Sequence, residues 1–99
     1  MFDIIPEPLA FEWDTGNIDK SLKKHEVKNE EAEQVFANEP LIVEDTKHST
    51  ASEQRFHCLG QTDKGKELFI SFTVRKNKVR IISARRQSRR ERKIYGKEA

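Results

Sequence analysis

The strongest constraint on the fold is a pair of alternating segments joined by a short polar turn. From Glu67 to Arg75 apolar residues take every second position, the pattern of a strand with one buried face. One side of this strand carries Leu68, Ile70, Phe72 and Val74, and the other carries Phe69, Ser71, Thr73 and Arg75. Lys76-Asn77-Lys78 predicts a tight turn, and Val79 to Ala84 predicts the next strand. The two strands therefore form an antiparallel hairpin.

Further elements precede and follow this hairpin. Leu41 to Val43 and Glu53 to Leu59 indicate two more strands, and the second of them extends the hairpin into a three-stranded antiparallel meander. Upstream, Leu9 to Trp13 indicates a first strand or an extended lead-in. Candidate N-caps and helical spacing predict a helix from about Gly16 to His25 and a second from Asn29 to the residues before Pro40. Ser88-Arg-Arg-Glu91 matches a capping box, which predicts a last helix over about Gln87 to Tyr95.

The expected fold class is α+β. We expect one domain over residues 1–99, in which the two N-terminal helices cover one face of the sheet. The opposite face would carry Glu53, Arg55, His57, Ser71, Thr73 and Arg75, joined by Ser83 and Arg85. Because this mixture of charges and hydroxyls does not suit a core, it predicts an open, phosphate-binding surface.

Charge is divided between the two halves of the chain. Residues 1–50 hold five Lys, no Arg and twelve Asp and Glu, a net charge of −7. Residues 51–99 hold fourteen Lys and Arg against five Asp and Glu, a net charge of +9, and include all eight arginines. Arginine offers a rigid set of donors that matches phosphate oxygens. A nucleic acid is therefore the first expected partner.

Other features exclude several classes of protein. The one cysteine, Cys58, cannot form an internal disulfide, and we interpret it as a small buried residue in a protein of the cytoplasm. No apolar run approaches the length of a membrane span, and residues 1–8 do not resemble a signal peptide. Three scattered histidines and one cysteine lack zinc-ligand spacing, so we expect no metal and no cofactor.

Several segments, taken in order, resemble the BrnT family of bacterial and archaeal type II toxins. The matching residues are Phe11-Glu-Trp-Asp14, Lys24-His25, Glu31-Ala32, Val35-Phe36, His48-Ser49, Glu53, Arg55-Phe56, Gly60, Gly65, Thr73, Arg75, Arg80-Ile-Ile-Ser-Ala-Arg85, Glu91 and Tyr95. The chain departs from the family's usual pattern at Asn17, Ser21, Glu26 and Glu39. Glu26 stands where a glycine usually ends the first helix, and it places a negative charge beside His25.

The resemblance implies a compact, RelE-like ribonuclease that stops translation by cutting RNA. It also implies a co-encoded antitoxin of the ribbon-helix-helix type, and it leaves the ribosome as a candidate partner. RNA can be cut without a metal, because its own 2′-hydroxyl attacks the adjacent phosphate with help from a base, an acid and cations. DNA lacks that hydroxyl and would not be cut.

The candidate catalytic residues are His25, Glu53, Arg55, Arg75, Arg85 and Tyr95. The three arginines would clamp phosphate, the alternative being salt bridges to Glu53 and Glu91 or a solvated surface. Glu53 would act as base or hold Arg55, and we favour holding, because a carboxylate beside arginine is a weak base. His25 would shuttle protons or close the first helix.

Tyr95 would donate a proton, stack on a base or pin the last helix to the sheet, and we favour the pinning role. The candidate RNA-binding residues are Lys24, Arg80, Arg86, Arg89 and Arg90, the alternative being a charged surface covered by an acidic antitoxin segment. His48 and His57 are weaker catalytic candidates. The competing functions are a non-catalytic nucleic-acid- or ribosome-binding module and a structural partner of an acidic protein.

Overall fold

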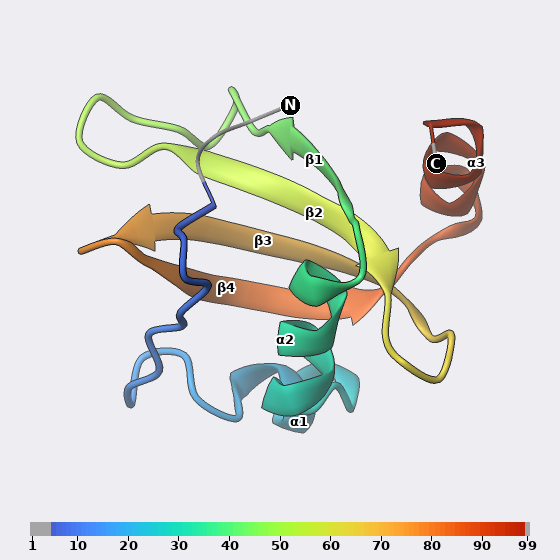
Figure 1. Cartoon of the computed structure of the whole chain (residues 1–99), viewed down its shortest axis with the longest axis horizontal. Coiled ribbons are helices and arrows are strands. Elements are labelled where there is room, and N and C mark those ends of the chain that lie inside the picture. The colour runs from blue at the N-terminus through green and yellow to red at the C-terminus, as the bar shows by residue number, and fades with distance from the viewer. Residues whose placement is uncertain (1–4, 99) are drawn as a thin grey trace.

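Four strands form one antiparallel sheet in the order β1-β2-β3-β4 in the computed structural model, which describes residues 5–98 (Figure 1). The strands are β1 (Leu41–Glu44), β2 (Arg55–Gln61), β3 (Glu67–Arg75) and β4 (Lys78–Arg86). The helices are α1 (Lys20–His25), α2 (Asn29–Ala37) and α3 (Arg89–Glu98). The predicted α+β class and the meander are therefore confirmed. In this part of the chain no helix is long and apolar enough to cross a membrane.

The hairpin turn between β3 and β4 contains two residues. Arg75 pairs with Lys78, and Lys76 and Asn77 between them have φ angles of 53° and 61°. Two successive left-handed residues are typical of the hairpin turn whose twist matches that of the flanking strands. The short polar turn expected from the sequence is confirmed.

A β-bulge interrupts β4 and changes the direction of its side chains. Ser71 pairs with Ser83, but the next residue of β3, Phe72, pairs with Ile81, so Ile82 is an extra residue on β4. Without this insertion, strict alternation would place Ser83 and Arg85 on the same face as Ile81. The bulge moves both side chains to the opposite face, beside those of β2 and β3.

The hydrophobic core lies between α2 and one face of the sheet. Ala32, Val35 and Phe36 of α2 are buried, as their spacing predicts. The rings of Phe36 and Phe72 meet edge to face, with 4.9 Å between their centroids. On the sheet this face carries Phe56, Cys58, Leu68, Ile70, Phe72, Val79, Ile81 and Ala84. Gly60 lets α2 approach closely, because a Cβ there would lie 2.8 Å from Cγ1 of Val35.

The N-terminal segment covers the outer edge of β4. Val79 donates its N–H to the carbonyl of Ala10 at 2.8 Å and accepts one from Glu12 at 2.8 Å. The expected lead-in around Phe11 is thus extended, and Phe11 packs against Phe36 of the core. An uncovered edge strand would offer free backbone groups to other chains, so this pairing protects β4.

Asn17 and Ser21 complete the cover of the β4 edge. The Asn17 side chain is buried and donates to the carbonyl of Ile81 at 3.0 Å. The Ser21 hydroxyl accepts the N–H of Ala84 at 2.8 Å. Both positions depart from the usual family pattern, and in this chain both residues satisfy backbone groups of β4.

The first helix is shorter than predicted. It begins at Lys20 rather than near Gly16, because the preceding residues form turns. Asp14 accepts the N–H of Gly16 at 2.8 Å, and Asp19 has a left-handed φ of 56°. Asp14 therefore caps a turn rather than the helix. The last helix begins at Arg89 instead of Gln87, and its predicted capping box is present, with Ser88 and Glu91 exchanging hydrogen bonds.

Glu26 ends α1 in a conformation that favours glycine. Its φ is 58°, and its N–H donates to Leu22 at 3.0 Å. A side chain in this conformation costs about 1 kcal/mol of stability.

We expect Glu26→Gly to raise the free energy of unfolding by about 1 kcal/mol, measured by urea denaturation. Glu26→Ala keeps the backbone strain and should change the free energy of unfolding by less than about 0.5 kcal/mol. Equal stabilisation by both variants would contradict this explanation.

Candidate active site

The sheet face opposite α2, named here the open face, carries three rows of side chains across the strands. The register places Arg55, Thr73 and Arg80 in the first row. Val43, His57, Ser71 and Ser83 form the second row, and Leu59, Phe69 and Arg85 form the third. Rows two residues apart along a strand are separated by about 7 Å. The predicted common face of Arg55, His57, Ser71 and Thr73 is therefore confirmed, and the bulge brings Ser83 and Arg85 into it.

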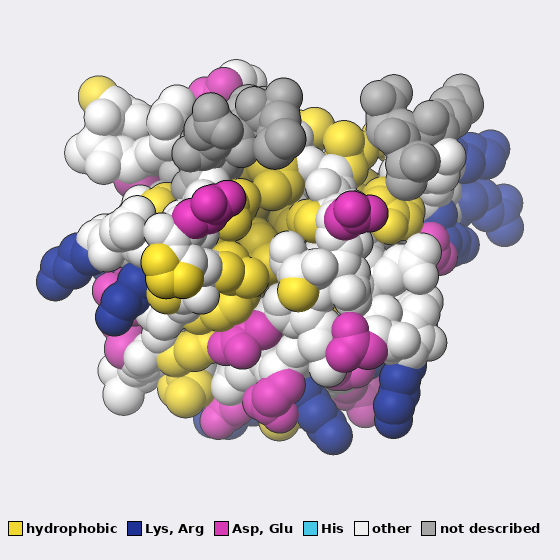
Figure 2. All heavy atoms as spheres, viewed as in Figure 1, with side chains coloured by type: hydrophobic (Ala, Val, Ile, Leu, Met, Phe, Trp, Pro, Cys, Tyr) yellow, Lys and Arg dark blue, Asp and Glu magenta, His cyan; other side chains and the backbone are white. Residues whose placement is uncertain are grey.

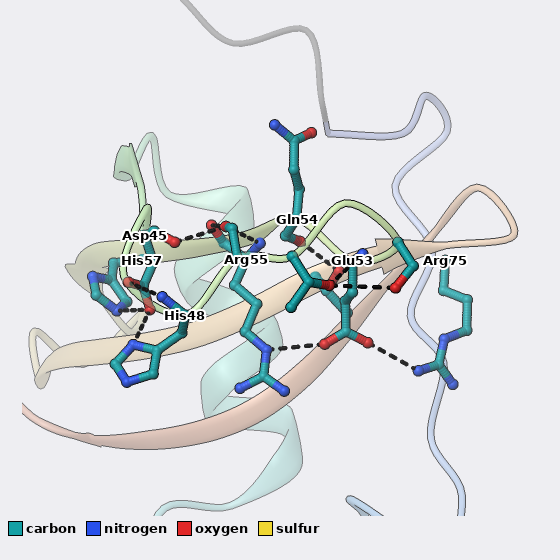
Figure 3. Close-up of polar contacts among 11 residues, drawn as sticks. Asp45, His48, Glu53, Gln54, Arg55, His57 and Arg75 are labelled. Carbon is teal, nitrogen blue, oxygen red and sulfur yellow. Dashed lines mark hydrogen bonds and ion pairs between the residues drawn. The ribbon is translucent and has the colours of Figure 1, made fainter.

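Two of the predicted arginines meet at one carboxylate. Glu53 accepts a hydrogen bond from Nε of Arg55 at 2.9 Å and one from Arg75 at 3.3 Å, each to a different oxygen (Figure 3). Glu53 precedes β2, whereas Arg75 ends β3, so the contact joins two strand ends. The favoured reading of Glu53 as the residue that holds Arg55 agrees with this geometry.

The same chain of charges continues to the N-terminal segment. Arg75 lies 3.7 Å from a carboxylate oxygen of Glu12, and Arg80 donates to the same oxygen at 3.0 Å. Arg80 also binds both oxygens of Asp14, at 2.8 and 3.0 Å. Each arginine of this network is therefore balanced by carboxylates. Arg80, predicted to bind RNA, is mostly buried and holds the N-terminal segment against β4.

The electrostatics make Glu53 a weak base. The hydrogen bond from Arg55 lowers the pKa of Glu53 below its usual value, and Arg75 adds to this effect, while burial opposes it. A carboxylate held ionised by two cations accepts a proton poorly at neutral pH.

Beside this network lies a pocket of about 480 Å³ lined by Ala51, Ser52, Glu53, Gln54, Phe56, Thr73, Val74 and Arg75.

Two histidines converge on one buried carboxylate beside Arg55. Oδ2 of Asp45 lies 2.8 Å from Nδ1 of His48 and 3.1 Å from Nε2 of His57 (Figure 3). Burial opposes ionisation of Asp45, but the hydrogen bonds from His48 and the charge of His57 outweigh it, so the pKa of Asp45 is lowered. Asp45 therefore remains charged, hydrogen-bonded to His48 and within ion-pair distance of His57.

Arg85 lies in the third row and is held by α3. Its guanidinium binds Glu91 through two hydrogen bonds of 2.8 Å, and its Cζ lies 4.3 Å from the centre of the Phe69 ring. On the adjacent strand, His57 contacts the same Phe69 ring at a centroid distance of 4.6 Å. Arg85 thus shares the open face with Arg55 and Arg75 but has its own carboxylate partner.

The remaining predicted residues lie at the margins of the open face or away from it. Lys24 and His25 end α1, and within residues 5–98 neither contacts the arginines of this face. Tyr95 of α3 is buried outside the main core cluster, and α3 contacts β2, whose Leu59 is buried on the open face. These positions agree with Tyr95 pinning α3 to the sheet.

Arg86, Arg89 and Arg90 are exposed near the start of α3. In the described part of the chain their side chains have no carboxylate partner, unlike the four arginines of the open face. Figure 2 shows Lys and Arg side chains gathered on the side where α3 lies. This basic surface is next to the third row of the open face.

Sequence reasoning missed Asp45, Glu12 and Asp14 as organisers of the site. Asp45 lies three residues before His48 in a turn, and that spacing was the available signal. Glu12 and Asp14 are distant in sequence from Arg75 and Arg80, so no local sequence pattern predicts these ion pairs. Among residues 5–98, no group of three or more His, Cys, Asp or Glu side chains is arranged to hold a metal ion.

The structure is thus of the α+β class, an antiparallel sheet with α2 on its core face and with arginines, His57 and hydroxyl side chains on the opposite face. The chain matches the family model described as "Ribonuclease toxin, BrnT, of type II toxin-antitoxin system" over residues 13–91. It therefore belongs to the BrnT family of ribonuclease toxins, whose members act with a cognate antitoxin. A search of curated proteins gave no match to the chain.

The Arg85–Glu91 pair predicts how stability depends on pH. The hydrogen bonds from Arg85 lower the pKa of Glu91 below its ordinary value of 4.5, so the pair stabilises the fold above that pH and less as the pH falls through the folded-state pKa. Since Arg85 is partly exposed, we expect Glu91→Gln to cost about 1 kcal/mol at neutral pH.

The measurement is urea denaturation of both proteins from neutral to acid pH. The difference between them should shrink as the pH falls below 4.5 and Glu91 becomes protonated in the wild type. Glu30→Gln removes an exposed carboxylate that has no ion-pair partner among residues 5–98, and it should preserve the pH dependence of the wild type. A difference for Glu91→Gln that stays constant with pH would argue against an electrostatic role of the pair.

Proposed function

We propose that this toxin is an endoribonuclease that cleaves RNA on the open face without a metal ion. The observation that carries the proposal is the convergence of Arg55 and Arg75 on Glu53, in a family of ribonuclease toxins. The two guanidinium groups come from different strands and approach one anion. A phosphate in place of that carboxylate would meet the same donors.

The proposed reaction uses the nucleophile that RNA already contains. The 2′-oxygen attacks the adjacent phosphorus, and the bond from phosphorus to the 5′-oxygen breaks, leaving a 2′,3′-cyclic phosphate and a 5′-hydroxyl. Arg55 and Arg75 would stabilise the negative charge on the pentavalent phosphate, while Glu53 keeps both groups oriented before RNA arrives. Arg85 would add a cation at the far end of the face, held in place by Glu91.

The basic surface at α3 is proposed to follow the RNA backbone. Arg86, Arg89 and Arg90 are exposed and without carboxylate partners among residues 5–98, so they are available to phosphates. Lys24 lies on α1, away from this surface, and would contribute little. For the other catalytic candidates we favour structural roles, in which His25 closes α1 and Tyr95 fixes α3.

The proposed partners follow from the toxin class. We expect a cognate antitoxin of the ribbon-helix-helix type, with an acidic segment that covers the basic surface, and a site of action in the cytoplasm. Whether the substrate is free RNA or RNA on the ribosome can be tested with the same protein. Both substrates share the 2′-hydroxyl chemistry described above.

The first prediction of this proposal is selective cleavage of RNA in the presence of EDTA. Purified protein is incubated with an RNA, the matching DNA, and translating ribosomes. We expect RNA fragments with 2′,3′-cyclic phosphate ends in at least one RNA sample and intact DNA, detected by electrophoresis and end analysis. Arg75→Ala should lower the rate by about a hundredfold, because one donor to the charged phosphate is lost.

The matched control is Lys64→Ala, which removes an exposed cation from the β2–β3 turn and should leave the rate unchanged. RNA that remains intact in every sample, but still binds, would favour the second candidate, a non-catalytic nucleic-acid-binding module. The unpaired basic surface at α3 is the observation that supports this alternative. Activity that EDTA abolishes and added metal restores would contradict the metal-independent reaction.

The second prediction concerns the salt dependence of RNA binding. Phosphate contacts release counterions, so affinity for single-stranded RNA should fall steeply with salt. Arg89→Ala and Arg90→Ala should each reduce the slope of log K against log salt by about 0.7, measured by fluorescence anisotropy. Lys64→Ala again serves as the control and should leave the slope unchanged. Equal slopes for all these variants would argue against an RNA track along α3.

A further inference from the structure

We propose that His57 is the general base of the cleavage reaction and that Asp45 orients it for this role. The inference rests on the proposed ribonuclease function and names a proton acceptor that the arginine site lacks. The geometry that supports it is the position of His57 in the middle row of the open face, between the arginine row and the Phe69 row.

The other candidates are poor proton acceptors where the reaction would occur. Both oxygens of Glu53 are engaged by arginines, and the pKa of Glu53 is lowered. The side chain of Tyr95, which belongs to α3, is buried. His25 lies at the end of α1 and does not contact the arginines of the open face. Among the residues that the structure describes, His57 is the titratable side chain that projects from a strand between the row of Arg55 and the row of Phe69.

The contacts of His57 leave one ring nitrogen available. Nε2 lies 3.1 Å from the buried carboxylate of Asp45, within ion-pair distance, so we assign the proton of a neutral ring to Nε2, the nitrogen that faces the carboxylate. Among residues 5–98 Nδ1 has no hydrogen-bond partner, and the side chain is 26% exposed. The lone pair of Nδ1 is therefore free to accept a proton. A carboxylate that holds a histidine in one tautomer and stabilises its charged form is a recurring arrangement in general-base catalysis.

Two neighbours of His57 have short polar side chains. Across the row its partners on β3 and β4 are Ser71 and Ser83, both partly exposed. Arg55 is two residues away on the same strand, and Phe69 contacts the His57 ring from β3. A phosphate held at Arg55 would place the linked ribose toward His57 and the base toward Phe69.

The charged and titratable groups around His57 are of both signs. Asp45 and His48 face it from the loop after β1, Arg55 flanks it on β2, and Arg85 lies beyond the Phe69 ring. On β1 its partner is the apolar Val43. Asp45 is thus the one anion in direct contact with the ring among the described residues, and it would stabilise the imidazolium formed during the reaction.

In the proposed step Nδ1 of His57 takes the proton from the 2′-hydroxyl as the 2′-oxygen bonds to phosphorus. The bond from phosphorus to the 5′-oxygen breaks, and the departing oxygen takes a proton from water. The imidazolium then returns its proton to the solvent, so no oxidant, reductant or metal is required.

The test compares His57→Gln with His48→Gln in single-turnover and steady-state RNA cleavage. We expect His57→Gln to lower kcat by about a hundredfold or more with little change in KM, because a proton acceptor is lost and binding is kept. His48→Gln removes the exposed ring that shares Asp45 and should lower kcat far less. Circular dichroism and RNA anisotropy establish that each variant folds and binds.

Two further readouts separate a chemical role from a structural one. A general base must be unprotonated to act, so the rate of the wild type should fall as the pH is lowered, and this fall should be absent in His57→Gln. Added imidazole should restore part of the activity of His57→Ala. Asp45→Asn should lower kcat by about tenfold or more and alter the pH profile, as expected of a positioning residue.

The outcomes distinguish this inference from the proposed function. If the wild type cleaves RNA and His57→Gln cleaves it at a similar rate, the inference is wrong and the ribonuclease function stands. A loss of activity without imidazole rescue and with an unchanged pH profile would assign His57 a structural role and also overturn the inference. A wild-type protein that cleaves no RNA, free or on ribosomes, would remove both proposals.

Discussion

The extra residue in β4 is the constraint on which the open face depends. Ile82 has no partner on β3, and because of it Ser83 and Arg85 point to the side opposite Ile81. On an uninterrupted strand Arg85 would point toward the core between the sheet and α2, where a guanidinium group is costly to bury. The bulge instead places Arg85 over Phe69, within reach of Glu91. One inserted residue thereby keeps Ala84 in the core while Ser83 and Arg85 join Arg80 on the open face.

Charge compensation is the second organising feature of this face. Arg55, Arg75, Arg80 and Arg85 are all paired with carboxylates, so the face presents oriented donors with little net charge. Such an arrangement suits catalysis better than tight binding, because donors already fixed in direction need no reorganisation when charge develops on the phosphate. Under the proposed function, long-range attraction of RNA would fall to the cations near α3, which have no carboxylate partner among residues 5–98. Orientation and attraction would then belong to different parts of the molecule.

The sequence predicted much of the fold because its strands and helices are locally consistent. The alternation of β3, the helical spacing of Ala32, Val35 and Phe36, and the capping box at Ser88 each depend on neighbouring residues alone. The start of α1 was predicted too early, since Asp14 is a good cap for a turn as well as for a helix. The bulge at Ile82 was not predicted, because alternation gives no signal for an extra residue.

The candidate site was predictable only where its residues share a strand or a strand pair. Arg55, His57 and Arg75 follow from alternation, whereas the pairing of Arg80 with Asp14 joins residues far apart in the chain. Asn17 illustrates the same limit. Asn17 departs from the usual family pattern, and its side-chain amide donates hydrogen bonds to the backbone carbonyls of Glu12 and Ile81. A buried amide with these contacts fixes the N-terminal segment along β4.

That segment carries Glu12 and Asp14, which in turn hold Arg75 and Arg80. The position of these arginines therefore depends on how residues 9–17 lie along the edge of the sheet. The same segment protects the edge of β4 and fixes the geometry of the site. A substitution at Asn17 would loosen an edge strand and, through Glu12, the orientation of Arg75. Departures from the family pattern at Asn17 and Ser21 are thus compatible with an intact site, because both residues form the hydrogen bonds that keep the edge closed.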